Sequence, residues 1–555
     1  MKKLLKYIFI IFIISSALSI WALIKYEHLP IFDSVLISLM LFGAGEPLHL
    51  ATKNMHILTS IFLILQMLVG LASLTIAFGI LANFLMSEKI SRVMSRNKIK
   101  KRDHVVVCGL GDLGFRVVEE LEQMGESVVI VDRGDEQDYI DMVKKRGHVV
   151  IIDNLRDPNV LDLACIDNAK SVIICIRDMV ISLDIALNAR KKREDIIIVL
   201  RMYDQELAHK IAEAFKIKVA LSTNALVAPV FAAASYERSV FQSIKVGHKL
   251  FISAHIQVQK DSELEGMTIN AISQKDLAVL KYISGEKHIK FPSGEHTLKA
   301  DDEFYITSSL KVLTDIKALN GETRRPLWER EKGRFENHII VCGLGDLGIL
   351  VVQELEKLGE SVVIIDRGDK TEYITTAEKA GHTIIKGDLK DPNSFEQARL
   401  NQAKSIILCT KDSLLNLNIA MDVRKVRKDI IIVLRIHDQD LADKVGDAFS
   451  IKVALSKNVL AAPAFAAASY DRDVFQSTKV GSQLFISANF KIKKDSPLSQ
   501  MTIDELRHKE LIVLKLISNN KPLIFPQGDL KLKQDDLLYV TCSIQTLKEL
   551  KALQQ

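Results

Sequence analysis

The chain of 555 residues lacks the short motifs that mark several common kinds of site. No Cys-x-x-Cys, Gly-x-Ser-x-Gly or His-Glu-x-x-His sequence occurs, which argues against a zinc or redox motif, a serine-hydrolase elbow and a zinc protease. The charge is nearly balanced, at +5, and no basic stripe carries interleaved aromatic residues. Nucleic acid is therefore not an expected partner.

Cysteine is also scarce, with six residues in the whole chain. Four of them, Cys108, Cys175, Cys342 and Cys409, fall at matching positions on apolar strands of two similar halves. We expect buried free thiols in a reducing compartment. The matching histidine pairs, His104 with His338 and His148 with His382, have no acidic cluster around them in the sequence, so we expect structural roles and no metal site.

One stretch occurs twice and organises the chain. His104 to Gly114 reads HVVVCGLGDLG, and His338 to Gly348 reads HIIVCGLGDLG. Each copy is an apolar run, Gly-x-Gly-x-x-Gly and a helical pattern, the order strand, phosphate-binding turn, helix. A second apolar strand then ends in an acid, Asp132 or Asp366, which can accept both hydroxyls of a ribose. The pattern predicts a Rossmann-like fold, which some proteins keep without a bound nucleotide.

Apolar strands alternate with amphipathic helices after each copy, which predicts a doubly wound parallel sheet. A helical stretch containing Pro229 is expected to run to about Phe241, and a small α+β lobe follows. The arrangement returns after 234 residues, since Asp132 maps to Asp366 (366 − 132). We predict a large lobe at 101–245 and a small lobe at 246–322 (repeat 1), a linker at 323–336, and lobes at 337–479 and 480–555 (repeat 2).

Residues 1–100 read as a transmembrane pore module. Apolar runs at about 4–24 and 57–86 are long enough to span a bilayer, and the segment at about 31–47 is too short and reads as re-entrant. The first run has a secretory signal peptide as its alternative. Gly70 and Gly79 are candidate gating hinges, or close-packing glycines. Lysines and arginines flank the outer ends of the two runs, so the positive-inside rule places both termini in the cytoplasm of a plasma (inner) membrane protein.

This order of features resembles a known family. Two membrane helices around a segment that ends in Gly-x-Gly-acid-Pro are similar to a two-span potassium-channel pore. Both repeats resemble the regulator-of-potassium-conductance (RCK) domain of TrkA-N and TrkA-C type, which also occurs in Trk-type potassium-uptake regulators. The resemblance covers nearly the whole chain.

The resemblance places the selectivity filter where the family reads Thr-Val-Gly-Tyr-Gly-Asp. The matching residues here are Leu41, Phe42, Gly43, Ala44, Gly45 and Glu46. Leu41 offers no hydroxyl, and Ala44 replaces the tyrosine whose packing helps to hold the filter open. The two glycines and the acid favour cations without choosing among them, so we expect poor discrimination between potassium and sodium, or a collapsed loop that does not conduct.

The resemblance also implies a regulatory nucleotide, NAD(H) or another adenine nucleotide, and leaves calcium open as a further ligand. Repeat 2 keeps all four family contact regions, and its candidate residues are Gly343, Gly345, Asp346, Leu347, Gly348, Asp366, Arg367, Gly387, Asp388, Thr410, Asp412 and Arg435. The arginines that follow the ribose acids, Arg133 and Arg367, either meet a phosphate or are solvated surface residues. Repeat 1 departs at Asp153-Asn154 and Ile176-Arg177-Asp178, which leaves a weaker set. That set is Gly109, Gly111, Asp112, Leu113, Gly114, Asp132 and Arg133.

The function implied is a ligand-gated cation channel of potassium type, not an enzyme, in which a cytoplasmic ring of RCK units controls the pore. Two spans per chain cannot enclose a pore, so a homotetramer in contact with lipid and monovalent cations is expected. The alternatives are a membrane-anchored nucleotide sensor or auxiliary subunit that does not conduct and, less favoured, an NAD-dependent oxidoreductase.

Overall fold

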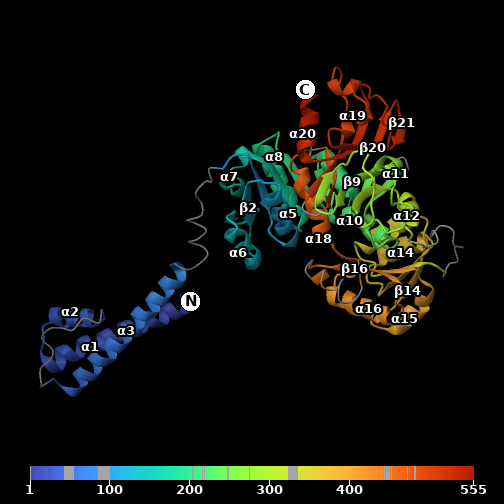
Figure 1. Ribbon diagram of the computed structural model, residues 1–555. Coiled ribbons are helices and arrows are strands. Elements are labelled where there is room, and N and C mark those ends of the chain that lie inside the picture. The colour runs from blue at the N-terminus through green and yellow to red at the C-terminus, as the bar shows by residue number, and fades with distance from the viewer. Residues whose placement is uncertain are drawn as a thin grey trace. The chain divides into compact units, whose positions relative to one another are not determined.

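The computed structural model divides into two compact units, Met1–Asn97 and Lys98–Gln555, called here the helical unit and the α/β unit. Figure 1 shows their elements. The described residues are 2–42, 55–85, 101–202, 205–215, 217, 219–246, 249–273, 276–322, 336–438, 441–442, 444, 451, 453–471, 473–480 and 483–554.

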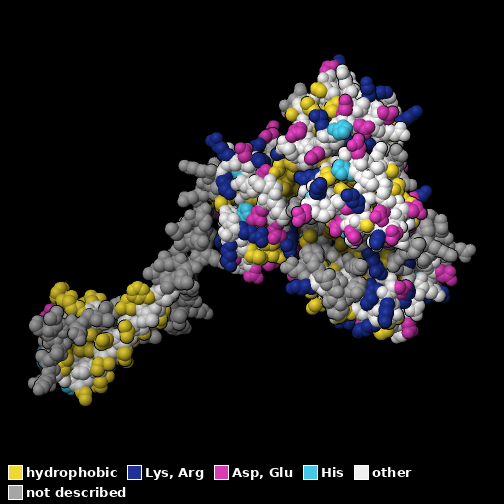
Figure 2. Space-filling model, in the orientation of Figure 1, with side chains coloured by type: hydrophobic (Ala, Val, Ile, Leu, Met, Phe, Trp, Pro, Cys, Tyr) yellow, Lys and Arg dark blue, Asp and Glu magenta, His cyan; other side chains and the backbone are white. Residues whose placement is uncertain are grey.

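The described part of the helical unit contains three helices with apolar surfaces. They are α1 (Lys2–Glu27), α2 (Ile31–Phe42) and α3 (Ile57–Leu85). Figure 2 shows hydrophobic side chains over these helices, and Ile64 and Leu68 of α3 are about 60% and 59% exposed. Among the described residues, one helical stretch, Ile57–Ile76, is long and apolar enough to cross a membrane. The span expected at 4–24 lies in α1, where the side chains of residues 2–12 are outside the described set.

A buried glutamine joins the three helices. Gln66 of α3 is fully buried, and its Nε2 donates to the Ser38 carbonyl oxygen of α2 at 2.9 Å and to Ser16 Oγ of α1 at 3.2 Å. Ser19 Oγ of α1 also donates to the Phe62 carbonyl oxygen at 3.1 Å. Polar contacts of this kind hold helices together where apolar contacts give no preference over lipid.

The large lobe of repeat 1 is a six-stranded parallel sheet in the order β3-β2-β1-β4-β5-β6. Its strands are β1 (His104–Cys108), β2 (Val128–Asp132), β3 (Val149–Ile152), β4 (Ala169–Ile174), β5 (Ile197–Met202) and β6 (Val219–Ser222). Its helices are α5 (Asp112–Gln123), α6 (Gln137–Lys145), α7 (Val160–Leu163), α8 (Met179–Lys192), α9 (Gln205–Ala214) and α10 (Thr223–Ala234). Alternate residues of β1 enter separate apolar clusters on the two faces, so helices cover the sheet on both sides, as predicted.

Repeat 2 has the same sheet in the order β14-β13-β12-β15-β16-β17. Its strands are β12 (Ile339–Cys342), β13 (Val362–Asp366), β14 (Thr383–Lys386), β15 (Ser405–Leu408), β16 (Ile431–Ile436) and β17 (Val453–Ser456). Its helices are α13 (Gly348–Lys357), α14 (Thr371–Lys379), α15 (Pro392–Gln397), α16 (Ser413–Val426) and α18 (Lys457–Ala468). The duplicated Rossmann-like fold class read from the two glycine motifs is confirmed.

Each small lobe is a five-stranded antiparallel sheet with short helices. The first contains β7 (Val240–Val246), β8 (Lys249–Gln257), β9 (Leu277–Ser284), β10 (Lys287–Lys290), β11 (Glu303–Ser308), α11 (Ile269–Ser273) and α12 (Leu310–Leu319). The second contains β18 (Val474–Val480), β19 (Gln483–Lys491), β20 (Leu511–Ser518), β21 (Lys521–Ile524), β22 (Leu537–Cys542), α19 (Ile503–Arg507) and α20 (Ile544–Ala552).

The end of α10 differs from the sequence-based expectation. The helix ends at Ala234, and Phe241 lies in β7, which pairs with β8 in the small lobe. The lobe boundary predicted at 246 therefore falls inside the first strand pair of the small lobe. The apolar pattern continues from α10 into β7, and periodicity alone does not separate a buried helix from a buried strand.

The two repeats exchange their last large-lobe helices. Helix α18 of repeat 2 packs on α5 of repeat 1, α10 of repeat 1 packs on α13 of repeat 2, and α10 and α18 contact each other. Figure 1 shows α5 beside α18. One apolar cluster includes buried residues of both repeats, among them Phe231 and Phe465. The α/β unit is thus an intramolecular pair of RCK-like repeats with a common core.

Ion pairs reinforce this exchange on both sides. Lys245 Nζ of β7 lies 2.9 Å from Glu354 Oε1 of α13, and Lys479 Nζ of β18 lies 2.7 Å from Glu120 Oε1 of α5. The small lobes also meet directly, through a cluster that contains Phe251 of repeat 1. Equivalent contacts on the two sides give the pair an approximate two-fold relation.

Candidate functional site

The glycine loop of repeat 2 joins β12 to α13, and two of its glycines are required by the fold. Gly343 has φ +93°, and a Cβ there would lie 3.0 Å from Thr410 Cγ2. A Cβ on Gly348 would lie 2.0 Å from the Gly343 carbonyl oxygen, so the helix approaches the loop too closely for any side chain. The packing of the protein itself therefore requires glycine at both positions, whether or not a ligand binds.

The middle glycine is different. A Cβ on Gly345 would have no atom within 4 Å, and its backbone is not in the left-handed region. The fold itself therefore does not require glycine at this position. The open space lies where the motif brings a pyrophosphate against the backbone, beside the free N–H groups at the start of α13. Gly111 of repeat 1 has the same open surroundings.

The acid at the end of β13 is held by the loop that it faces. Asp366 Oδ2 accepts a hydrogen bond from the Leu344 N–H at 2.6 Å, and Oδ1 accepts one from the Gly368 N–H at 2.7 Å. The Gly387 N–H donates to the Asp366 carbonyl oxygen at 3.0 Å. A carboxylate has about four lone-pair sites, so each oxygen retains capacity for a ribose hydroxyl.

A buried asparagine links the ends of β15 and β16. Asn416 Nδ2 donates to the carbonyl oxygens of Thr410 and Arg435, both at 3.0 Å, and Asn416 Oδ1 lies 2.5 Å from Thr410 Oγ1. Arg435 is only 7% exposed, and its Nη1 donates to the Cys409 carbonyl oxygen at 3.1 Å. Sequence reasoning identified Thr410 and Arg435 but missed Asn416, whose only signal is an amide in the first turns of a helix.

Two other predicted residues, at the rim of the site, make structural hydrogen bonds. Asp412 caps α16 by accepting from the N–H groups of Leu414 and Leu415 at 3.0 Å. Asp388 Oδ1 accepts from the Lys390 N–H at 3.0 Å and from Arg367 at 3.3 Å, and these contacts lower the Asp388 pKa. Arg367 is therefore held near the ribose acid by a neighbouring carboxylate.

In repeat 2, Lys370 forms an ion pair with Asp346, the acid inside the glycine loop. Burial alone would raise the pKa of Asp346, but a hydrogen bond and charge from Lys370 outweigh it and lower the pKa. The Tyr373 hydroxyl donates to the same carboxylate oxygen at 3.2 Å. The Leu347 side chain is buried in the core, so only its backbone can contact a ligand at the start of α13.

Repeat 1 has the same loop with different surroundings. Asp132 accepts from the Leu110 and Gly134 N–H groups at 2.6 and 2.7 Å, as Asp366 does in repeat 2. The threonine, however, is replaced by Ile176, whose Cγ1 would lie 2.8 Å from a Cβ on Gly109. Asp112 accepts from Asn458 of the exchanged helix α18, and Leu113 is buried. A Cβ on Gly114 would lie 1.9 Å from the Gly109 carbonyl oxygen.

The predicted arginine of repeat 1 faces solvent. Arg133 pairs with Asp135 at 2.7 Å, and its side chain is 58% exposed. Asp178, after the replaced threonine position, caps α8 through the Val180 and Ile181 N–H groups. Repeat 1 therefore keeps the loop and the ribose acid but offers fewer polar groups around them.

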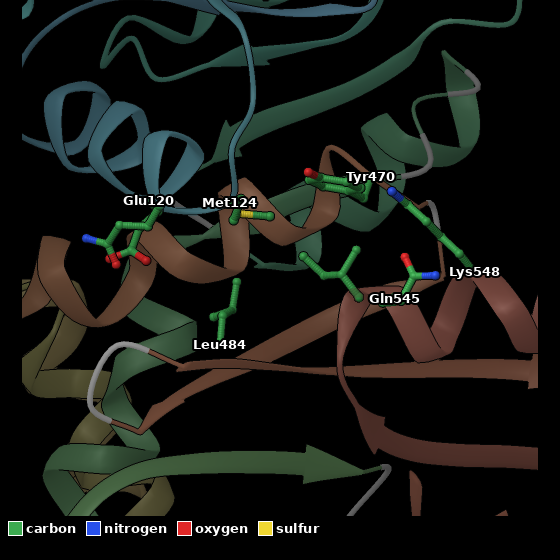
Figure 3. A pocket seen from close by; sticks show the side chains of 8 residues that line it. Glu120, Met124, Tyr470, Leu484, Gln545 and Lys548 are labelled. Atoms are coloured by element: carbon green, nitrogen blue, oxygen red, sulfur yellow. The ribbon is translucent and has the colours of Figure 1, made fainter. Parts of the chain in front are cut away.

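Two equivalent hollows lie where each large lobe meets the other repeat's small lobe. The first, of about 300 Å³, is lined by Glu120 of α5, Met124 directly after that helix, Tyr470, Leu484 of β19, and Gln545 and Lys548 of α20 (Figure 3). The second, of about 270 Å³, is lined by residues of α13, β8 and α12, among them Glu354, Leu250 and Lys311, the equivalents of Glu120, Leu484 and Gln545. Both involve the C-terminal parts of α5 and α13, the helices that begin at the glycine loops, and both lie at the junction between lobes.

The predicted filter and hinges are only partly placed. Leu41 is buried in α2, whereas Gly43, Ala44, Gly45 and Glu46 lie outside the described residues, as does the Phe42 side chain. Gly70 and Gly79 lie within α3, and a Cβ on Gly79 would meet nothing within 4 Å. The filter and hinge assignments stay predictions.

Other candidate groups have structural contacts. His104 and His338 contact the carbonyl oxygens of Ala164 and Ala398 through Nε2 at 2.8 and 2.7 Å. In the part of the chain that the structure describes, no three His, Cys, Asp or Glu side chains form a metal-binding group. The turn acid Asp302, one of the tandem carboxylates, accepts from the Lys299 N–H at 2.8 Å and so closes its own turn.

The cysteines are free and buried, as predicted. Cys108 ends β1 and Cys175 directly follows the neighbouring strand β4, and the two belong to apolar clusters on opposite faces of the sheet. Cys342 of β12 and Cys409, directly after β15, do the same. Burial raises the pKa of Cys175 and of Cys409 to about 12. These thiols stay protonated and cannot pair across the sheet.

Comparisons with known proteins agree with this architecture. The TrkA-N domain model matches residues 105–223 and 339–456, and the TrkA-C domain model matches residues 488–555. Together these matches cover more than half of the chain.

Similar proteins include potassium channel proteins and potassium uptake proteins. Potassium channel protein 1 of Methanocaldococcus jannaschii is 23% identical over 232 residues, 41% of this chain and 69% of that protein. Trk system potassium uptake protein TrkA homolog 1 of Methanosarcina mazei is 16% identical over 452 residues, 78% of this chain and 96% of that protein. The solved GsuK channel bound to NAD has a TM-score of 0.53 at 14% identity, covering 99% of this chain and 97% of that chain, which shows a similar fold. The chain therefore belongs to the RCK family, whose members carry TrkA-N and TrkA-C domains and include potassium-channel proteins.

Proposed function

We propose that the protein is a cation channel of potassium type whose RCK repeats bind a regulatory adenine nucleotide. NAD(H) is the first candidate, with AMP, ADP or ATP next. The observation that carries the proposal is the open space at Gly345, where a Cβ would have no atom within 4 Å. Beside it lies Asp366, whose carboxylate accepts a hydrogen bond from the same loop. The fold similarity to the NAD-bound GsuK channel supports the same ligand class.

The proposed ligand lies across the carboxyl ends of β12, β13 and β15. Asp366 accepts hydrogen bonds from the ribose hydroxyls, and the pyrophosphate rests on the loop at Gly345 and the N-terminus of α13. Arg435 supplies a buried positive charge nearby. A carboxylate at this place repels a 2′-phosphate, so NADP(H) binds less well unless Arg367 compensates.

The nucleotide acts as an effector in this proposal and undergoes no reaction. The relatives described above are named as a potassium channel protein and a potassium uptake protein. Each described Rossmann-like sheet is followed by a small antiparallel lobe that packs on the other repeat. An oxidoreductase requires a substrate site beside the nicotinamide, and consumption of NADH by the purified protein would be needed to revive that alternative.

The chain is proposed to work as a homotetramer in the plasma (inner) membrane, with both termini and the repeats in the cytoplasm. The apolar surfaces of the helical unit would contact lipid, and about four two-span chains enclose a pore in proteins of this type. Val180 and Leu414, which occupy equivalent places at the starts of α8 and α16, are 61% and 68% exposed. Such apolar surface on both repeats suits contacts between neighbouring chains of a ring.

Gating would follow from a change of angle between lobes. A ligand shifts such an equilibrium only if it binds the two arrangements with different affinity. The hollows at the lobe junctions leave room for the small lobes to move against α5 and α13. Movement transmitted to α3 would act near the proposed hinges, Gly70 and Gly79.

A second candidate function is a nucleotide sensor or auxiliary subunit that does not conduct ions. The altered filter residues Leu41 and Ala44 favour it. The match to 96% of the length of a TrkA homolog, named as a potassium uptake protein, supports it independently. Ion flux into liposomes containing the purified protein separates the two candidates, since a sensor alone gives no flux above protein-free vesicles.

The nucleotide assignment is tested with a matched pair of variants of the full-length protein. Asp366→Ala and Asp132→Ala each remove an acid that accepts two backbone hydrogen bonds of nearly identical length. Both variants should therefore lose similar stability, but only Asp366→Ala should lose NAD binding in calorimetry. Unchanged binding in Asp366→Ala, or no NAD binding by the wild-type protein, contradicts the assignment.

A further inference from the structure

The amide of Asn416 has its orientation fixed by the backbone. Asn416 lies in the first turn of α16 and is fully buried. Its Nδ2 donates to the carbonyl oxygens of Thr410 and Arg435, both at 3.0 Å. A carbonyl oxygen only accepts, so a reversed amide would set its own oxygen against two others. The two backbone contacts therefore place Asn416 Oδ1 beside the Thr410 hydroxyl.

The Thr410 hydroxyl uses its single proton inside the protein. Its Oγ1 lies 2.5 Å from Asn416 Oδ1 and 3.2 Å from the Asp412 carbonyl oxygen, and both of these oxygens accept. A hydroxyl carries one proton and two lone pairs. With the proton donated inward, only lone pairs remain for a group outside the protein. Thr410 can therefore accept a hydrogen bond from a ligand but cannot donate one to it.

Thr410 and Asp366 lie on opposite sides of the glycine loop. Strand β12, which leads into the loop, pairs with β13 on one side and with β15 on the other. Asp366 ends β13, and Thr410 follows β15 by two residues. A Cβ on Gly343 would lie 3.0 Å from Thr410 Cγ2, so the threonine lies against the loop. A ligand whose pyrophosphate rests at Gly345 would extend toward Asp366 at one end and toward Thr410 at the other.

An acceptor at the second end discriminates among adenine nucleotides. AMP, ADP and ATP end in phosphate oxygens, which accept hydrogen bonds, so lone pairs of the threonine would face lone pairs of the phosphate. NAD(H) and ADP-ribose carry a second ribose beyond the pyrophosphate, and its hydroxyls can donate. A site that hydrogen-bonds a ligand hydroxyl discriminates against analogues that lack it.

Repeat 1 has neither member of this pair. Ile176 stands at the position of Thr410 and Ser182 at that of Asn416, each 234 residues earlier (410 − 176 and 416 − 182). Isoleucine has no hydroxyl to orient, and Ser182 Oγ donates to the Asp178 carbonyl oxygen at 2.7 Å. The asparagine is thus replaced in the repeat where the hydroxyl is absent.

We propose that Asn416 is a positioning residue that holds the Thr410 hydroxyl as an acceptor, and that this acceptor selects a nucleoside diphosphate with a hydroxyl group beyond its second phosphate. Asn416 is fully buried, so it acts on the ligand through Thr410 alone. The inference rests on the proposed function and narrows its ligand from adenine nucleotides in general to those that carry a second ribose.

The test is calorimetry of the full-length protein with NAD, ADP-ribose and ADP, and the readout is the affinity of each variant relative to wild type. Thr410→Val removes the hydroxyl and keeps the shape of the side chain. It should weaken NAD and ADP-ribose by about three- to tenfold, as expected for one lost hydrogen bond, and should not weaken ADP by more than about twofold. Thr410→Ser keeps the hydroxyl and should bind all three ligands within about twofold of wild type.

Asn416→Ser introduces the residue of repeat 1 and frees the Thr410 hydroxyl to rotate. Binding of NAD and ADP-ribose should again fall by about three- to tenfold, whereas ADP should keep its affinity, because the freed hydroxyl can donate to a phosphate. The melting temperature should fall as well, since two backbone carbonyl oxygens lose their donor. Ser182→Ala, at the equivalent buried position of repeat 1, is the control and should bind all three ligands as wild type does.

The outcomes separate this role from structural support and from nucleotide binding itself. Equal losses for the three ligands in Asn416→Ser would identify a purely structural residue and overturn the inference, as would wild-type affinity for NAD in Thr410→Val. Either result leaves the nucleotide assignment intact. If Asn416→Ser does not fold, Thr410→Ile with Asn416→Ser, the pair that repeat 1 carries, takes its place and is judged by the same ratio of affinities. A wild-type protein that binds none of the three ligands ends the proposed function and this inference together.

Discussion

Two glycines of one loop should respond in opposite ways to the same substitution. In Gly348→Ala, the new Cβ would lie 2.0 Å from the Gly343 carbonyl oxygen, which is backbone and cannot rotate away. Contacts of this kind are relieved only by moving α13 away from β12. Overpacked sites typically cost about 1–3 kcal/mol, and this clash belongs at the upper end or beyond. Gly348→Ala should lower the melting temperature by several degrees or prevent folding.

Gly345→Ala should be harmless to the fold. Its Cβ meets no atom within 4 Å, and no left-handed backbone is required. Substituting alanine for glycine at a compatible position stabilises a protein by about 0.4–1 kcal/mol, because the unfolded chain loses conformational freedom. We therefore expect an unchanged or slightly higher melting temperature for ligand-free Gly345→Ala.

The same methyl group should abolish ligand binding, because it occupies the place proposed for the pyrophosphate. A loss of at least about tenfold in affinity, which corresponds to about 1.4 kcal/mol, is expected. Calorimetry with NAD and thermal unfolding with and without NAD measure both effects on one sample. Gly111→Ala, with the same open surroundings in repeat 1, is the matched control. Wild-type affinity in Gly345→Ala would refute the proposed position of the phosphates, and destabilisation of the ligand-free variant would refute the reading of the open space.

Three further predictions concern stability, assembly and the pore. Burial and nearby arginines lower the Lys457 pKa to about 7, so between about pH 7 and pH 10 the unfolded chain binds a proton that the folded protein lacks. The free energy of unfolding of the ligand-free protein should therefore rise over this range, by at most about 1.4 kcal/mol per pH unit, and the melting temperature of Lys457→Thr should lack this rise. Native mass spectrometry in mild detergent should give tetramers, and only monomers or dimers would argue against the channel assembly. Reversal potentials in mixed potassium and sodium solutions should show weak selectivity and loss of cation preference in Glu46→Gln, whereas a strongly potassium-selective current would contradict the interpretation of Leu41 and Ala44.

The fold was largely predictable because the glycine motif is a local signal. Strand, turn, helix and acid follow each other within one βαβ unit, and the motif recurs with its spacing intact in both repeats. The helix exchange was not predictable in the same way. The residues of α10 and α18 are apolar on every side, and such a pattern indicates burial without saying which surface provides it.

The same distinction between local sequence signals and long-range packing applies to the site. Asp366 and the loop glycines follow from spacing, and the structure brings them together at the end of the sheet. Lys457 carried no sequence signal, since a lysine at the first position of a helix is ordinary. Burial lowers its pKa first, and the charges of Arg435, Arg201 and Arg177 follow; the last two precede it by more than 250 residues and belong to the other repeat.

The exchange of α10 and α18 also bears on how the two repeats can change over time. In a dimer of identical chains, every substitution appears twice across the two-fold axis, so a lysine at the start of one exchanged helix would also stand at the start of the other. Joining the repeats in one chain removes this restriction, and threonine stands at one position and lysine at the other. Neither repeat is then an independent part, because each encloses a helix of its neighbour. Duplication has here produced an obligatory pair whose members are free to diverge in chemistry but not in shape.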